Sequence, residues 1–363
     1  MKRSLATIGA MLAVFAFLAV VPRGNTRAYT INTGFTHPCH EEMTYAAMKT
    51  AIARGAIDPA ADVPIPADDS WRDVLAYLTE GMTLEQDGDR EAFLALSLIV
   101  SSRYPDNRGE SITNAKSLRK IHRDPEDQDS HFLRSADDDY AEGNLSAIDA
   151  GLAHIRSQLE AARSYVALEQ GDQLIETPVY IEYYGLVNVT VWAPAFYMGV
   201  AAHAVEDSFS HTVRSDDLHT IHHVCNYVDA VSFDYDRDRD GLRHSWAMDR
   251  CDEEAAGIAV GATEAAGDFI SLFADLEGDL DGAFAGFTHD WMDHREGCDD
   301  SNDYCGSKWV EVARADPSLP IWEDYFGCDC AATPGAVTAG GSGPWLLLLP
   351  AALAGIALAL KTR

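Results

Sequence analysis

One stretch of the chain places two imidazoles and a carboxylate at helical intervals. His203, Asp207 and His211 stand four residues apart, so in a helix they would lie along one stripe. At about 1.5 Å per residue, the two histidines would be about 12 Å apart along the axis. One cation cannot bind both, but Asp207 could share one ion with His203 while its second oxygen reaches toward another. Apolar neighbours favour this interpretation over a solvated helix end with two ordinary histidines.

The residues around this motif predict where its helix lies in the fold. A helix is predicted over 189–210, and its segment 192–210 is apolar on all sides, which is typical of a helix in the middle of a bundle. Further helices are predicted at 38–53, 147–168 and 252–276, and a strand is predicted at 179–187. Strand-like segments are otherwise few and short. The sequence therefore predicts an all-α, multi-helix bundle with loop insertions.

The motif resembles the metal-binding helix of the zinc-dependent phospholipase C and single-strand nuclease superfamily. In that superfamily a helix carries His-x3-Asp followed by a later His, and the Asp bridges two zinc ions. The resemblance implies that His203, Asp207 and His211 bind a cluster of two or three zinc ions. Here the later His stands four residues after the Asp instead of the usual six.

The start of the chain offers a second match to this superfamily. Thr-His at 36–37 resembles its early ligand, and members also bind zinc through the α-amino group and carbonyl of an aromatic first residue. Cleavage before Tyr29 would place an aromatic residue eight positions ahead of His37. The resemblance thus implies Tyr29 and His37 as ligands, with His40 as a bystander.

Two further elements follow in the superfamily's order. Tyr-Pro-Asp at 104–106 resembles an element that supplies a carboxylate, and Ser-His-Phe at 130–132 resembles one that supplies an imidazole. The resemblance implies Asp106 and His131 as ligands. Asp106 could instead orient the attacking water as a general base, or be a turn residue after Pro105. An insertion at 108–128 makes the gap between them longer than the superfamily usually shows.

The last zinc ion should need a histidine and a carboxylate one helical turn apart. No His-x3-Glu stands in the expected place. The candidates are His244 with Asp249, which are five residues apart, and His222 or His223 in a His-rich connector. His244 is favoured because it precedes a predicted helix.

An acidic run forms a separate cation candidate. Carboxylates stand on alternate positions before a glycine, at Asp234, Asp236, Asp238 and Asp240, as oxygen-rich calcium loops require. With Asp236 as first ligand the twelfth position is Ala247, so no complete EF-hand is present. A calcium-stabilised loop, which would hold His244 in position, and a merely solvated acidic loop both fit the pattern.

Both ends of the chain carry apolar segments. A basic start and an apolar run at 5–21 predict a secretory signal over 1–28, followed by a metal-dependent hydrolase-like domain over 29–327. Segment 328–363 contains Cys-Asp-Cys, a small-residue spacer, an apolar helix at 345–360 and a basic tail. It resembles the MYXO-CTERM sorting tags of myxobacteria, with Lys-Thr-Arg in place of a longer arginine cluster. The resemblance implies cleavage by a processing protease and attachment at the outer cell surface; a simple membrane anchor is the alternative.

Cysteine content and charge agree with export. Seven cysteines favour disulfides, with Cys298–Cys305 and Cys225–Cys251 as candidate pairs and Cys39 left over. A net charge of −31, from 58 acidic and 27 basic residues, repels a nucleic-acid backbone and suits divalent cations.

These observations predict an exported, surface-directed, zinc-dependent phosphodiester hydrolase that resembles phospholipase C and acts on a phospholipid. A single-strand nuclease stays open, because acidic nucleases can bind strands by stacking and through their metals. The third possibility is a non-catalytic, calcium-stabilised surface protein on the same scaffold, which the missing His-x3-Glu favours.

Overall fold

The computed structural model describes residues 38–110, 124–181, 184–228, 235–245, 247–251 and 255–315. These residues all belong to one unit. The described part is mostly helical and contains two small sheets. The all-α prediction therefore holds for the bundle and is wrong for the strands.

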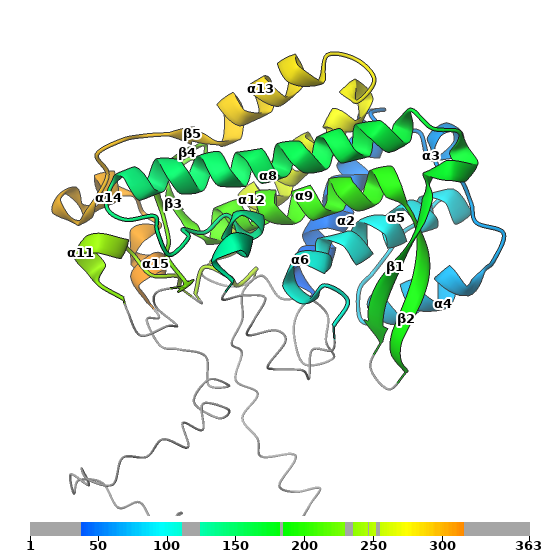
Figure 1. The fold of residues 1–363 in the computed structure, drawn as a ribbon, viewed down its shortest axis with the longest axis horizontal. Coiled ribbons are helices and arrows are strands. Elements are labelled where there is room, and N and C mark those ends of the chain that lie inside the picture. Colours follow the sequence, from blue (N-terminus) through cyan, green and yellow to red (C-terminus); the bar gives the residue numbers. More distant parts are fainter. Residues whose placement is uncertain are drawn as a thin grey trace, which may run out of the picture. The chain divides into compact units, whose positions relative to one another are not determined.

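Helix α9 (Ala193–Ser210) is the centre of the bundle. It packs against α2 (Cys39–Ala53), α5 (Asp89–Ser102), α8 (Glu142–Val166) and α12 (Ala256–Ser271) (Figure 1). Every residue of α9 except Tyr197 is buried, which explains why its apolar residues point in all directions. The predicted central helix is confirmed, although residues 189–192 belong to the preceding strand.

The contact between α5 and α9 depends on a glycine. A Cβ atom at Gly199 would lie 1.8 Å from Ser101 Oγ and 2.9 Å from the Leu98 carbonyl oxygen. Only glycine permits so close an approach of the two backbones. The approach places the C-terminal end of α5 beside the middle of α9.

The other predicted elements differ from the structure mainly at their ends. Helix α8 begins five residues before the predicted start at 147, and segment 252–276 forms α12 followed by the 3-10 turn η4 (Leu272–Asp275). The predicted strand at 179–187 spans the turn of a hairpin between β1 (Leu174–Ile181) and β2 (Gly185–Trp192). Alternation of apolar residues continues across this turn, so the pattern did not reveal it.

In the sequence, α9 is preceded by the β1–β2 hairpin and followed by the strands of a three-stranded sheet. Strands β1 and β2 pair in antiparallel register, and the hairpin extends away from the helices (Figure 1). After α9, β3 (Thr212–Arg214) pairs antiparallel with β4 (Thr220–Val224), which pairs in parallel with β5 (Asp293–His294).

The remaining elements are short helices and turns that complete the unit. They are α3 (Pro59–Asp62), α4 (Ser70–Leu78), α6 (Tyr104–Asn107), η1 (Pro125–His131), η2 (Gln170–Gln173), α11 (Arg237–Asp240), α13 (Leu280–Trp291), η5 (Asp300–Asn302), α14 (Asp303–Gly306) and α15 (Val310–Ala315).

Among the described helices, the apolar segment Ala256–Asp275 is long and apolar enough to cross a membrane. Its most apolar window is 56% buried within the unit, where α12 packs against α2 and α9. Core packing accounts for its composition. The apolar segment at 345–360 lies outside the described residues.

Two disulfides are present in the described part of the chain. Cys298–Cys305 is bonded as predicted. The predicted pair Cys225–Cys251 is wrong, because Cys251 bonds to Cys39 across 212 residues. Packing of α2 against α12 brings these two cysteines together. Cys225 is a buried thiol, and burial raises its pKa to about 12, so it stays protonated.

Candidate metal centre

The central helix supplies residues to two separate clusters of titratable side chains. His203 and Asp207 lie in the buried middle of α9. His211 is the C-cap residue, and its backbone N–H donates to the Asp207 carbonyl oxygen. The three side chains are at most 4% exposed, so each needs a partner inside the protein.

The first cluster centres on the Asp207 carboxylate. Asp207 Oδ2 lies 2.9 Å from His203 Nε2 and 3.0 Å from His131 Nδ1. The two imidazole nitrogens are 3.2 Å apart. Around a tetrahedral zinc ion with bonds of ~2.0–2.1 Å, neighbouring ligand atoms lie roughly 3.3 Å apart. The triangle formed by His131, His203 and Asp207 is therefore of a size that suits one face of such a site.

Asp106 and His40 complete this cluster. Asp106 Oδ1 lies 3.9 Å from both His131 Nδ1 and His203 Nε2. His40 Nε2 lies 3.3 Å from Asp207 Oδ1, and its ring stacks on that of His203 with centroids 4.1 Å apart. His40, Asp106 and His203 also form a group of convergent metal-ligand atoms. The interpretation of His40 as a bystander is thus corrected.

A sequence signal for His40 existed and was missed. His40 shares its helix with buried residues three, four, seven and eight positions later, from Met43 to Met48. It therefore lies on the stripe of α2 that faces the core. An imidazole on a buried stripe requires a polar partner, and α9 offers carboxylates.

The second cluster lies at the end of α9. His211 Nε2 is 3.4 Å from Asp249 Oδ1, and His244 Nε2 is 2.7 Å from Asp249 Oδ2. The rings of His211 and His244 pack edge to face, with centroids 4.7 Å apart. Although five residues separate His244 from Asp249, residues 247–249 form a turn rather than a helix, so the one-turn helical spacing does not apply. The structure thus brings the pair favoured for the last ion, His244 and Asp249, together with His211.

The imidazoles are oriented by acceptors behind them. His203 Nδ1 lies 2.7 Å from the Ser102 carbonyl oxygen, and His211 Nδ1 contacts the His131 carbonyl oxygen. His40 Nδ1 lies 2.6 Å from Glu206 Oε2. Because a carbonyl or carboxylate oxygen can only accept, these contacts place a proton on Nδ1, so that in the neutral imidazole the Nε2 lone pair faces the clusters. Metal-binding histidines are commonly held in this way.

Several buried oxygens lack hydrogen-bonding partners of suitable geometry. Within the described residues, these include Asp207 Oδ1 and both carboxylate oxygens of Asp249. All three face imidazole nitrogens at 2.7–3.4 Å. A buried carboxylate without hydrogen bonds is costly, and a cation between these groups would satisfy it. The donor set therefore fits metal ions of the kind that bind imidazole and carboxylate.

In the first cluster, the pKa values of Asp207, His203 and Asp106 are shifted in different ways. Burial raises the pKa of Asp207, but the imidazoles of His203 and His211 and a hydrogen bond from His131 hold it well below its ordinary value. Burial lowers the pKa of His203. Burial also raises the pKa of Asp106, against the opposing effect of His203 and His40. Asp207 is therefore ionised without metal, while Asp106 binds a proton more readily than an ordinary aspartate.

In the second cluster, the pKa shifts favour the charged forms of His211 and Asp249. Burial lowers the pKa of His211, but Asp207 and Asp249 outweigh this effect and raise it to about 9. Burial raises the pKa of Asp249, but the neighbouring His244 and His211 hold it below its ordinary value. The metal-free second cluster is thus an imidazolium and a carboxylate at neutral pH, and ligation of a cation would displace protons.

The other predicted ligands have different outcomes. Tyr29, His37 and Asp234 lie outside the described residues. Asp236 caps α11 by accepting from the backbone of Asp238 and Arg239.

The other two described acidic residues of the run differ in their surroundings. Asp240 is buried and pairs with Arg239, while Asp238 is exposed. Among the described residues these carboxylates do not join a convergent group; Asp236 is used by the cap and Asp240 by the arginine. Backbone pairing with Asn226 holds the segment that carries His244.

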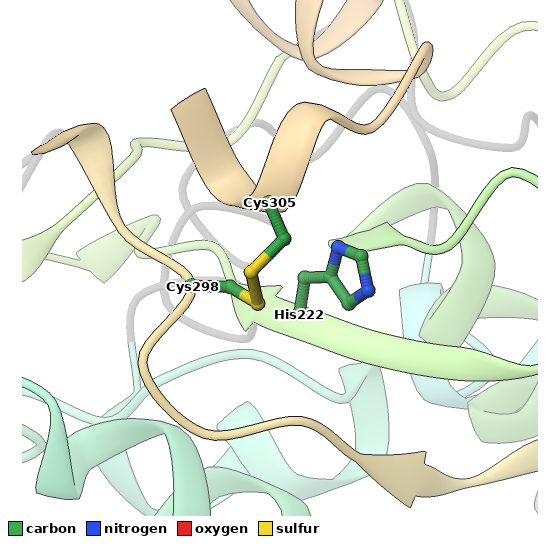
Figure 2. Close-up of side chains that lie close together, drawn as sticks. All are labelled: His222, Cys298 and Cys305. Carbon is green, nitrogen blue, oxygen red and sulfur yellow. A yellow bond between two sulfur atoms is a disulfide. The ribbon is translucent and has the colours of Figure 1, made fainter. Parts of the chain in front are cut away.

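The alternative ligands in the connector, His222 and His223, make contacts with the backbone instead. His223 Nε2 accepts from the Leu242 backbone N–H, and His222 Nδ1 lies 3.0 Å from the Tyr304 carbonyl oxygen. His222 also lies beside Cys298 and Cys305 (Figure 2). The two sulfur atoms are bonded to each other, so they are not thiolates and do not offer a metal site in this state.

Comparisons with known proteins do not add an identification. No protein-family model matches the chain, and neither a curated protein nor a solved structure matches it. The interpretation of the two clusters therefore depends on their own geometry and on the resemblance of the motifs.

Proposed function

We propose that this chain is an exported, surface-directed, zinc-dependent phosphodiester hydrolase that resembles phospholipase C. The observation that supports this most is the pair of clusters along α9: Asp207 belongs to the first and His211, four residues later, to the second. The first would be formed by His40, Asp106, His131, His203 and Asp207, and the second by His211, His244 and Asp249.

Zinc ions bound there would lower the pKa of a water and stabilise the charge of the phosphoryl oxygens. Asp207, His203 and His131 would hold the ions, since their atoms are the most closely convergent. Asp106 would accept the proton of the attacking water. Its side chain is 12% exposed, whereas the other described members are at most 4% exposed, so it is the carboxylate that solvent reaches most readily.

Two observations favour phospholipid as the substrate over nucleic acid. The net charge of −31 repels a polyanion. At the start of β2, Tyr184 is 80% exposed and Leu186 is 63% exposed, and such side chains suit a lipid–water interface. A Cβ atom at Gly109, close after Asp106, would lie 2.6 Å from the Pro178 carbonyl oxygen of β1, so the hairpin adjoins the segment that carries the proposed base.

The proposal can be tested with the purified exported chain. Metal content is measured by mass spectrometry, and hydrolysis is measured on phosphatidylcholine vesicles and on single-stranded DNA, with and without chelator. Two or more zinc ions with lipid turnover support the proposal. DNA cleavage alone would favour the nuclease, and calcium without turnover would favour a non-catalytic surface protein; either result would contradict the phospholipase proposal.

The lipid interface has its own test. The double variant Y184S/L186S should lose about 10-fold activity on vesicles, because less apolar surface enters the bilayer. Activity on a soluble, short-chain phosphodiester should be unchanged. If the variant keeps the full activity of the unmodified protein on both substrates, the hairpin does not contribute to lipid binding.

A further inference from the structure

Helix α9 carries a second buried acid that the metal clusters do not use as a ligand. Glu206 immediately precedes Asp207 and is completely buried. Helical geometry turns its side chain about 100° away from that of Asp207, toward α2. A buried carboxylate in an apolar helix requires partners that satisfy both of its oxygens.

Both oxygens of Glu206 are satisfied by residues of α2. Oε2 lies 2.6 Å from His40 Nδ1, and Oε1 accepts a hydrogen bond of 2.7 Å from Thr44 Oγ. His40 and Thr44 are four residues apart and lie on the same face of α2. Glu206 therefore spans one turn of the neighbouring helix, while the opposite edge of the His40 ring faces Asp207 at 3.3 Å.

The acceptor behind His40 differs from those behind the other oriented imidazoles. His203 and His211 place Nδ1 against neutral backbone carbonyls, whereas His40 places it against a side-chain carboxylate. A carboxylate acceptor makes the imidazole a stronger base and fixes both its tautomer and its ring orientation. The same contact would therefore strengthen binding of a cation at Nε2.

We infer that Glu206 is a positioning residue that holds His40 with its proton on Nδ1, so that Nε2 binds a cation together with Asp207. The inference rests on the proposed metal-dependent function. It makes His40 a ligand set by a residue next to the motif, while Thr44 only satisfies the carboxylate oxygen that does not face His40. Glu206 does not contact the cation itself, because both of its oxygens face α2.

Variants separate the charge of Glu206 from its hydrogen bonds. E206Q is isosteric: its carbonyl oxygen can still accept from His40, and its amide can donate to the Thr44 oxygen, so only the charge is lost. E206A removes both. T44V leaves the contact between Glu206 and His40 intact and serves as the matched control for damage to the α2–α9 packing.

Zinc affinity of the full chain is measured by competition with a chromophoric chelator. We expect E206Q to weaken the tightest zinc site about 10-fold and E206A about 100-fold, in line with loss of a carboxylate behind a ligating histidine. T44V should bind zinc within about 3-fold of the unmodified protein. Wild-type affinity in both Glu206 variants, or an equal loss in T44V, would overturn the inference.

The His40 tautomer gives a readout that does not depend on activity or on metal. Nitrogen–proton correlation spectra of the metal-free protein, recorded at a pH at which His40 is neutral, should show His40 protonated on Nδ1 in the unmodified chain and in E206Q. In E206A this preference should be lost. An unchanged His40 signal in E206A would overturn the inference. If the unmodified protein binds no zinc but His40 shows the expected tautomer, the proposed function fails and the hydrogen-bonding part of the inference stands.

Discussion

The two clusters along α9 are built on different kinds of support. In the first, His40, His131 and His203 come from α2, η1 and α9, and His203 is held by the end of α5. In the second, only His211 adjoins a long helix, while His244 and Asp249 lie in a turn region before α12. We infer that the first cluster is preformed by helix packing and that the second depends on a loop that must be held in place.

Asp207 is where the two clusters meet. It contacts His203 and His131 directly, and His211 Nδ1 lies 3.9 Å from its Oδ2. D207N keeps the shape but removes the charge that both clusters share. We expect loss of bound zinc and a decrease in kcat/KM of about 10⁴-fold, or about 5.5 kcal/mol.

The control for this variant is D149N, an exposed aspartate on α8. Metal content and phosphatidylcholine hydrolysis are measured for both proteins. Normal zinc content in D207N would show that Asp207 is not a shared ligand, and a comparable loss in D149N would point to an effect of net charge.

The Cys39–Cys251 disulfide connects the two clusters through the backbone. Cys39 precedes His40, and Cys251 follows Asp249 by two residues. In the chain-entropy model, a loop of this length stabilises the folded state by about 5 kcal/mol, whereas the short Cys298–Cys305 loop contributes about 2.5 kcal/mol. The double variant C39S/C251S should therefore lower the free energy of unfolding about twice as much as C298S/C305S.

Chemical denaturation under non-reducing conditions measures the free energy of unfolding of both double variants. Metal analysis shows whether either disulfide also supports a cluster. C39S/C251S should also release metal from the second cluster, because the turn bearing Asp249 loses its covalent connection to α2. C298S/C305S should retain full metal content. Equal metal content in the two double variants would argue that core packing alone holds the turn.

The contrast between the clusters also explains what the sequence could predict. His203 and Asp207 were found because they are close in sequence on one helix whose apolar surroundings imply burial. His40 was missed because its role depends on the packing of α2 against α9, over 160 residues away. The Cys39–Cys251 bond was missed for the same reason, since proximity in sequence favoured Cys225.

The fold shows the same division between local and distant information. Helix α9 was predicted from its apolar composition, because that signal is local. The β1–β2 hairpin was not predicted, because an alternating apolar pattern continues from the first strand into the second. The pairing of β4 with β5 joins residues more than 70 positions apart, and no local pattern predicts such a contact.

Loss of the second cluster alone should have a smaller effect than loss of Asp207. D249N removes the carboxylate that faces both His211 and His244 and leaves the first cluster intact. We expect zinc content to fall by one ion and kcat to fall about 10²-fold, or about 2.7 kcal/mol. Loss of all zinc would mean that the two clusters bind cooperatively, which would contradict the independent support inferred for the first.

The smallest expected effect is a pH dependence that distinguishes the clusters in the metal-free protein. Burial opposes but does not prevent the rise of the His211 pKa to about 9 beside Asp207 and Asp249, against about 6.5 in the unfolded chain. The folded state then binds more protons, so the stability from this group is fully present below pH 6.5 and is lost as the pH rises through 9. His203, whose pKa is lowered by burial, is neutral in the folded state across this range, so it does not contribute a loss of this sign.

Thermal unfolding of the metal-free chain should therefore shift downward by roughly a few degrees between pH 6.5 and 9. The shift should be smaller in H211Q, which removes the titrating imidazole but can still donate from its amide. Zinc should abolish the shift in the unmodified protein, because ligation keeps His211 neutral at every pH in this range. A shift of the same size in H211Q would assign the titration to His40, whose pKa is also raised, and would place the proton-releasing group in the first cluster instead of the second.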